Sequence, residues 1–150
     1  GAIERRRAFI VAPGSNRKSV VYVANLAERL ARFTEEAINS TPLLRVWNVA
    51  DPYAPTQREI FNAIAVNLNR RSPPEVPFAL LAAAARIADS GSFLLGRQGR
   101  FSDRVNKLRS TTVFSGEALD SALRYRPSTA FSEAVRETVA WYLRNPTEAR

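Results

Sequence analysis

Apolar residues recur along this chain with two periods, which divide it into short extended segments and longer helices. Runs of β-branched and aromatic residues predict three strands, at 7–12, 19–23 and 43–49. Apolar positions three or four residues apart predict five helices, at about 25–37, 56–68, 78–89, 116–123 and 130–144. The glycine-containing stretch 90–112 fits neither period, and we expect it to be less regular.

Polar residues at two helix starts predict how those helices begin. Asn25 is a suitable N-cap, and Glu28 stands at the third helical position to answer it. Thr56 and Glu59 have the spacing of a capping box, which explains Glu59 as a cap rather than as a catalytic acid. The sequence therefore predicts side-chain caps on both helices.

Three of the predicted helices are expected to bury apolar side chains. Leu26, Leu30 and Phe33 form a predicted buried stripe on the first helix. The helix at 78–89 is apolar nearly all round, so we expect it to be mostly buried. The last helix has its apolar face at Phe131, Val135, Val139 and Tyr142.

The element order is strand, strand, helix, strand and then helices, which indicates a mixed α/β chain without a complete βαβαβ unit. The 150 residues correspond to one domain, and a hydrophobic fraction of 45% excludes an intrinsically disordered chain. No apolar run reaches the roughly 18 residues that a membrane-spanning helix needs, so we expect no membrane association.

The composition excludes several kinds of chemistry. The chain has no cysteine and no histidine, which rules out disulfides, thiolate or imidazole metal sites and Ser-His-Asp triads within it. It contains no Gly-x-Gly-x-x-Gly and no Walker loop. No catalytic or metal site can be assembled from its residues, and the lack of cysteine is compatible with the cytoplasmic location that we expect.

Positive charge is the main functional signal, because 22 basic residues against 14 acidic ones give a net charge of +8. Such an excess favours an anionic partner. Asn16 and Lys18 stand beside a glycine turn, where they could hold a phosphate or form a solvated loop. Arg100, Arg104 and Lys107 have helical spacing, which indicates an anion-binding face, a basic loop that orders on binding, or an ordinary charged surface.

A series of short motifs suggests a family. They are Tyr22-Val-Ala-Asn25-Leu-Ala27, Val46-Trp-Asn-Val-Ala-Asp51, Pro55-Thr56-x-x-Glu59-Ile60, Ala122-Leu-Arg-Tyr-Arg-Pro127 and Thr138-Val-Ala-Trp141-Tyr142. In this order and spacing the chain resembles the C-terminal half of the extended short-chain dehydrogenases/reductases, the NAD-dependent epimerases and dehydratases of nucleotide sugars. The segment 16–26 is most similar to bacterial UDP-sugar 4-epimerases.

The resemblance implies a substrate site made of cations. Lys18 falls where this family commonly carries an arginine that contacts the substrate diphosphate, and Asn16 lies just upstream on the same loop. The family's second diphosphate arginine corresponds to Lys107 or Arg104, and Arg100 is a weaker candidate. A UDP-sugar or a related nucleotide sugar is therefore the expected ligand.

The implied fold is the C-terminal part of a Rossmann-type enzyme, a mostly helical substrate lobe with a few short strands. The family's glycine-rich NAD loop and Tyr-x-x-x-Lys pair belong to an N-terminal lobe that these 150 residues do not contain. We therefore expect the chain alone to be inactive, with NAD bound by the other lobe. The segment 25–49 would pack on that lobe, so the chain alone is expected to self-associate or to bind it.

A second interpretation does not use the resemblance. A free-standing basic α/β module that binds nucleic acid or another polyanion would carry the same charge excess. Salt separates the two possibilities, since nucleic-acid binding weakens steeply in proportion to the phosphates that are neutralised. A nucleotide-sugar site should instead distinguish uridine from other bases.

Overall fold

The computed structural model describes residues 2–38, 46–94 and 100–145 of this chain, which form a mixed α/β structure that is mostly helical. Part of the predicted strand 43–49 lies outside the described residues. The elements are β1 (Ile10–Ala12), α1 (Val23–Ile38), α2 (Gln57–Asn67), β2 (Glu75–Pro77), α3 (Phe78–Leu94), α4 (Phe101–Arg109), α5 (Glu117–Ala122) and α6 (Phe131–Arg144). No helix among them is long and apolar enough to cross a bilayer.

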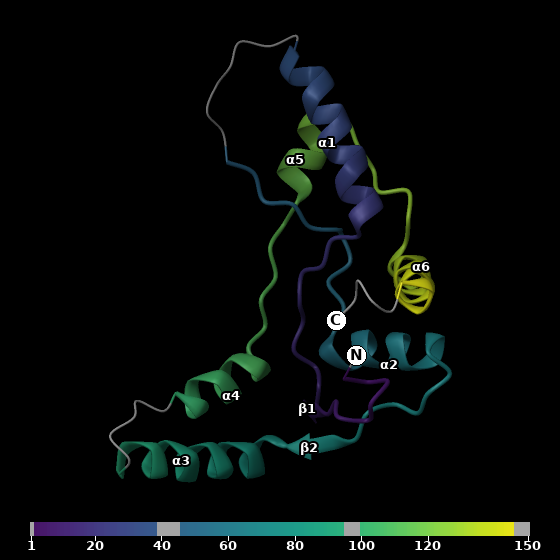
Figure 1. Ribbon diagram of the computed structural model, residues 1–150. Coiled ribbons are helices and arrows are strands. Elements are labelled where there is room, and N and C mark those ends of the chain that lie inside the picture. The colour runs from purple at the N-terminus through teal and green to yellow at the C-terminus, as the bar shows by residue number, and fades with distance from the viewer. Residues whose placement is uncertain (1, 39–45, 95–99, 146–150) are drawn as a thin grey trace.

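The helices are grouped in pairs around a very small sheet (Figure 1). α1 and α5 lie together at the top of the view, α3 and α4 at the lower left, and α2 and α6 on the right. β1 and β2 pair in parallel between the lower groups, with Val11 opposite Val76. Ile10 and Val11 are buried, so this sheet forms the centre to which α2 and α3 are attached.

A tight turn joins β1 to the following loop. Gly14 has a φ of +68°, in the left-handed region that favours glycine, and its amide donates to the Val11 carbonyl at 2.7 Å. A Cβ at this position would meet Ile10 Cγ2 at 2.7 Å. The Gly14 carbonyl accepts from the amide of Arg58 at 3.0 Å, which fixes the start of α2 next to the sheet.

The predicted strand at 19–23 is wrong. Val23 already belongs to α1, and the preceding residues are extended without joining a sheet. Residues 46–50 are not a strand either, and Val46 is 94% exposed. The β-branched residues favour extended backbone, but a strand also needs a continuous ladder, and among the described residues only isolated backbone bonds, such as that from Ser19 to Thr112, reach these positions.

The predicted cap at Asn25 is also wrong, because α1 begins two residues earlier at Val23. The Asn25 side chain is fully buried and bonds both backbone groups of Thr129, donating to its carbonyl at 3.1 Å and accepting from its amide at 3.3 Å. Glu28 accepts from the hydroxyls of Tyr125 at 2.8 Å and Ser128 at 3.1 Å. Both residues thus tie α1 to the segment before α6.

The capping box of α2 is confirmed. Thr56 Oγ1 accepts from the Glu59 amide at 3.2 Å, and Glu59 Oε2 accepts from the Thr56 amide at 2.7 Å. The backbone bond from Thr56 is the main reason why the pKa of Glu59 lies below its usual value. Glu59 therefore serves α2 as a cap, as its spacing predicts.

Two of the predicted buried faces are exposed. On α1, Leu30 and Phe33 are 56% and 43% exposed, although Leu26 is half-buried. On α3, Leu80 and Ile87 are 64% and 73% exposed, because α4 and β2 cover only part of this helix. Part of the stretch predicted to be irregular is also helical, since α3 extends to Leu94 and α4 follows it.

A buried arginine joins three parts of the chain. The Arg29 side chain on α1 is 1% exposed and reaches Asp120 of α5 at 2.7 Å and Asp51 at 2.9 Å. Its guanidinium lies 4.9 Å from the centre of the Tyr125 ring. The bonds to Asp120, and then those to Asp51, raise the pKa of Arg29, so it stays charged in this apolar surrounding.

Candidate functional site

The loop that carries Asn16 and Lys18 runs beside the segment that follows α4 (Figure 1). Lys18 and Thr112 form a parallel bridge, in which the Thr112 amide donates to the Arg17 carbonyl at 2.9 Å. The Ser19 amide donates to the Thr112 carbonyl, also at 2.9 Å. Two segments more than 90 residues apart in the sequence are thereby held side by side. We call Lys18, Arg100, Arg104 and Lys107 the basic strip.

Asn16 joins the loop to two neighbouring segments through hydrogen bonds. It is 8% exposed, and its Nδ2 donates to the Leu108 carbonyl at 3.1 Å. Its own carbonyl accepts from the Gln57 amide at 2.9 Å. The bond to Leu108 uses one of the two amide protons of Asn16, and it joins the loop to the end of α4.

Lys18 keeps donor capacity for a ligand. Its ammonium donates to Thr112 Oγ1 at 3.3 Å, and its backbone amide donates to the Pro55 carbonyl at 3.0 Å. An ammonium has three protons, so the bond to Thr112 leaves two of them to donate. The side chain is therefore anchored at the loop and still able to bind an anion.

A carboxylate on α3 positions the helix that carries the other cations. Asp89 accepts from the amides of Phe101 at 2.8 Å and Ser102 at 3.0 Å, the first two residues of α4. The bonds from Ser102, and then that from Phe101, lower the pKa of Asp89. The capping residue of α4 thus comes from another helix rather than from Arg100, which precedes α4 and makes no side-chain cap.

The cations on α4 are exposed, and they lie at different distances from the loop. Lys107 is in the last turn, next to the Leu108 carbonyl that binds Asn16. Arg104 lies one turn earlier, with its guanidinium 5.9 Å from the centre of the Phe101 ring. Arg100 precedes the helix, about 10 Å further along the axis than Lys107 at 1.5 Å per residue. The fold therefore brings the loop, through Asn16, to the Lys107 end of α4 and leaves Arg100 more distant.

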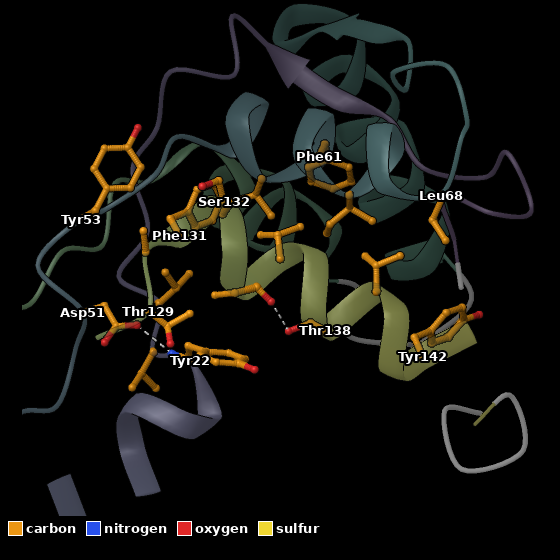
Figure 2. A pocket seen from close by; sticks show the side chains of 18 of the residues that line it. Tyr22, Asp51, Tyr53, Phe61, Leu68, Thr129, Phe131, Ser132, Thr138 and Tyr142 are labelled. Atoms are coloured by element: carbon orange, nitrogen blue, oxygen red, sulfur yellow. Dashed lines mark hydrogen bonds between the residues drawn. The ribbon is translucent and has the colours of Figure 1, made fainter. Parts of the chain in front are cut away.

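A second region is an apolar pocket of about 950 Å³ between α2 and α6 (Figure 2), which we call the tyrosine pocket. Its apolar lining includes Phe61 and Ile64 of α2 and Val135 of α6. Residues 2–4, 20–22, 51–53, 127, 129 and 130 contribute to the lining from other parts of the chain. None of the residues of the basic strip lines this pocket.

Tyrosines around this pocket donate their protons to carboxylates. The Tyr22 hydroxyl donates to Glu137, and the Tyr53 hydroxyl donates to Glu59 Oε1 at 2.7 Å. These bonds raise the pKa of both tyrosines, because a phenolate would face a neighbouring negative charge. The Tyr22 amide also donates to Asp51 Oδ2 at 2.8 Å, a bond that Figure 2 shows.

The charged side chains that line the pocket are acidic, whereas the chain as a whole is basic. The described lining of the pocket contains the carboxylates of Glu4 and Asp51 and no lysine or arginine. Tyr142 donates to Glu4 Oε2 at 2.6 Å at the far end of α6. In the part of the chain that the structure describes, no group of three or more acidic residues could hold a metal ion.

The sequence alone does not predict this pocket. The stripe at Ile60, Ile64 and Leu68 and the face of α6 are visible as apolar periodicity, but periodicity indicates burial and not a cavity. The two stripes lie on helices about 70 residues apart in the chain, and the space between them depends on how these helices pack. The periodicity identifies many of the pocket's apolar residues without showing that they surround a hollow.

No family model matches this chain, and no curated protein matches it.

Proposed function

We propose that this chain is the substrate-binding part of an NAD-dependent nucleotide-sugar epimerase or dehydratase of the UDP-hexose 4-epimerase kind. The observation that carries the proposal is the pairing of the loop at 16–19 with the segment 108–114. The family resemblance assigns Lys18 of this loop, and Lys107 or Arg104 just before the segment 108–114, to one diphosphate site. The adjacency of the loop and this segment in the fold is what such a site requires.

The chemistry of the pair suits a diphosphate. Lys18 and Lys107 supply ammonium groups from two segments, and charge-assisted bonds to phosphate oxygens are stronger than neutral ones. Holding the diphosphate would fix where the attached sugar lies and so orient it for reaction. Asn16 positions the loop, and Asp89 positions α4 through its amides.

NAD does not fit the described residues. β1 leads into a turn and an extended loop rather than into the start of a helix, which is where a dinucleotide-binding strand places the pyrophosphate. Gly14 is required there by its contact with Ile10 and by its positive φ. In the proposed enzyme, the cofactor and the catalytic Tyr-x-x-x-Lys pair are contributed by a separate Rossmann lobe. This chain alone is then inactive, and its role is to hold the substrate.

The exposed apolar face of α1 agrees with this proposal. Leu30, Phe33 and Val46 are all substantially exposed, although residues of this kind usually lie in a core. In the proposed enzyme this face, with the rest of the segment 25–49, packs against the Rossmann lobe. Exposed apolar side chains of this kind are typical of an interaction surface.

Calorimetric titration of the 150-residue chain with UDP tests the proposal. Lys18→Ala should weaken UDP binding by about 1–3 kcal/mol, the usual value of a charge-assisted hydrogen bond. Arg71→Ala is the matched control, since Arg71 is an exposed cation in the connector between α2 and β2 and should leave the affinity unchanged. An affinity equal to that of the parent chain in Lys18→Ala would remove Lys18 from the site.

One observation favours a nucleic-acid or polyanion module as the second candidate. Phe101 is 43% exposed beneath the Arg104 guanidinium, and exposed aromatic rings beside cations are surfaces on which bases stack. The same titration with single-stranded RNA separates the candidates. A nucleic-acid module should lose affinity steeply with added salt and show no preference for uridine. A nucleotide-sugar site should prefer UDP to ADP with a shallow salt dependence.

A further inference from the structure

The tyrosine pocket is a separate candidate site, because it shares no lining residue with the basic strip. Its volume of about 950 Å³ lies within the range of about 300–1,000 Å³ that small organic ligands occupy in proteins. Phe61, Ile64 and Val135 are only half-buried where they line it. An apolar ligand body would therefore remove apolar side chains from water, which is the main favourable contribution to such binding.

The polar groups around the pocket determine which head group would fit. A tyrosine hydroxyl has one proton, and those of Tyr22 and Tyr53 are donated to Glu137 and Glu59. Towards a ligand these hydroxyls can only accept. The Asp51 carboxylate is also an acceptor, already bonded by the Tyr22 amide and by Arg29. A ligand head that bonds these oxygens must accordingly donate hydrogen bonds.

The charges favour a cationic head over a neutral one. Glu4 and Asp51 are in the lining, and Glu137 and Glu59 lie directly behind the hydroxyls of Tyr22 and Tyr53. Arg29 neutralises much of the Asp51 charge, and Arg17 acts on Glu59, but Glu137 bonds the neutral hydroxyl of Tyr22. A positive head group at this position gains Coulomb energy, whereas a carboxylate or sulfate would be repelled.

We propose that the tyrosine pocket binds an amphiphile with an apolar body and a positively charged ammonium head, such as a long-chain alkylammonium. The body lies along the apolar faces of α2 and α6. The head lies at the Tyr22 end, where it donates to the hydroxyl oxygen of Tyr22 in front of Glu137 (Figure 2).

The test compares dodecylammonium, dodecanol and laurate, titrated below their aggregation concentrations into the 150-residue chain. The net charge of +8 attracts laurate to the protein non-specifically, so a preference for the cation runs against the overall field. We expect dodecylammonium to bind at least about tenfold more tightly than laurate, with dodecanol between them. Laurate binding as tightly as dodecylammonium would overturn the proposal.

Two variants locate the binding. Thr138→Trp places a large side chain in the middle of the pocket from an exposed position on α6, and should abolish dodecylammonium binding. Val66→Trp is the matched control, because Val66 is 73% exposed on α2 and outside the pocket, and it should bind like the parent chain. Binding that survives in Thr138→Trp would place the amphiphile elsewhere and overturn the assignment.

Glu137→Gln tests the head group independently of the body. Glu137 is exposed, so the variant should fold, and the Tyr22 hydroxyl would then lie next to a neutral amide. We expect the preference for dodecylammonium over dodecanol to fall while dodecanol binding stays the same. An unchanged preference would show that the carboxylate does not select the head group. This result decides the proposal even if Thr138→Trp does not fold.

Discussion

The basic strip and the tyrosine pocket differ in almost every physical respect. The strip consists of exposed cations that backbone hydrogen bonds hold together, with Lys18 anchored to Thr112 and α4 capped by Asp89. The pocket consists of apolar side chains, and its hydroxyls face carboxylates. The net charge of +8 therefore agrees in sign with the side chains of the strip but not with those that line the pocket. Total charge predicts the sign of one ligand, and local charge reverses it for the other.

The two regions meet at the segment that leads into α2. The Pro55 carbonyl accepts from the Lys18 amide, and Thr56 bridges to Arg17, so the strip is fixed to this segment. Asp51 lines the pocket four residues earlier and bonds Arg29. Substitutions along this connection should affect the two regions to different extents, and they provide direct tests of the comparison.

The largest effect is expected at Arg29. Arg29→Met should lower the free energy of unfolding by about 3–5 kcal/mol, because it leaves the carboxylates of Asp51 and Asp120 partly buried without their cation. Urea denaturation measures this loss. Arg32→Met is the control, since Arg32 is exposed over the same Tyr125 ring and should cost less than about 1 kcal/mol. Equal losses in the two variants would contradict the structural role of Arg29.

A smaller effect is expected at the cap of α2. Thr56→Ala should destabilise the chain by about 1 kcal/mol, the typical cost of losing an N-cap side chain. Thr34→Ala, at an exposed position within α1, should change stability by no more than about 0.5 kcal/mol. Thermal or urea unfolding of the two variants side by side gives the result. A neutral Thr56→Ala variant would show that tertiary packing alone fixes the start of α2.

The smallest expected effect is the pH dependence of the start of α4, the helix that carries cations of the strip. Because the pKa of Asp89 is lowered in the folded chain, its stabilisation of α4 is complete at neutral pH. It is lost as the pH falls through the folded pKa, below the ordinary value of about 3.9. Hydrogen exchange should therefore show the amides of Phe101 and Ser102 losing protection in acid.

The control for this pH effect is Asp89→Asn. In this variant the protection of the same two amides should be low already at neutral pH, and it should not fall further over the pH range in which Asp89 of the parent chain is protonated. The amide of Thr56 should keep its own acid dependence, since it bonds Glu59, whose pKa is also lowered. If Asp89→Asn also removed the acid dependence of the Thr56 amide, the caps of α4 and α2 would not act independently.

The sequence predicts a side-chain hydrogen bond correctly where both partners lie within one turn of a helix. Thr56 and Glu59 are three residues apart, and their capping box is confirmed. Asn25 fails as a predicted cap because its partner, Thr129, is more than 100 residues away and bonds it more completely than a helix start would. An isolated pattern cannot distinguish these two uses of the same polar side chain.

Burial was predicted less well than helix position. α3 has the composition of a core helix, yet Leu80 and Ile87 are exposed, because the main described neighbours of this helix, α4 and β2, cover only part of it. Periodicity states which face of a helix is apolar, but not whether anything covers that face. The same limit applies to the candidate sites. The spacing of the cations on α4 predicts that they lie on one helix. The pairing of that region with the loop at 16–19 is a long-range contact, which spacing does not predict.

A double-mutant cycle on UDP binding tests the central claim, that this loop and α4 hold a single diphosphate. Calorimetry would compare the parent chain, Lys18→Ala, Lys107→Ala and the double variant. If both ammonium groups bind one ligand, each single change weakens UDP binding, and the double loss differs from the sum by at least about 0.5 kcal/mol. Strictly additive losses, or an affinity unchanged by either substitution, would contradict the claim.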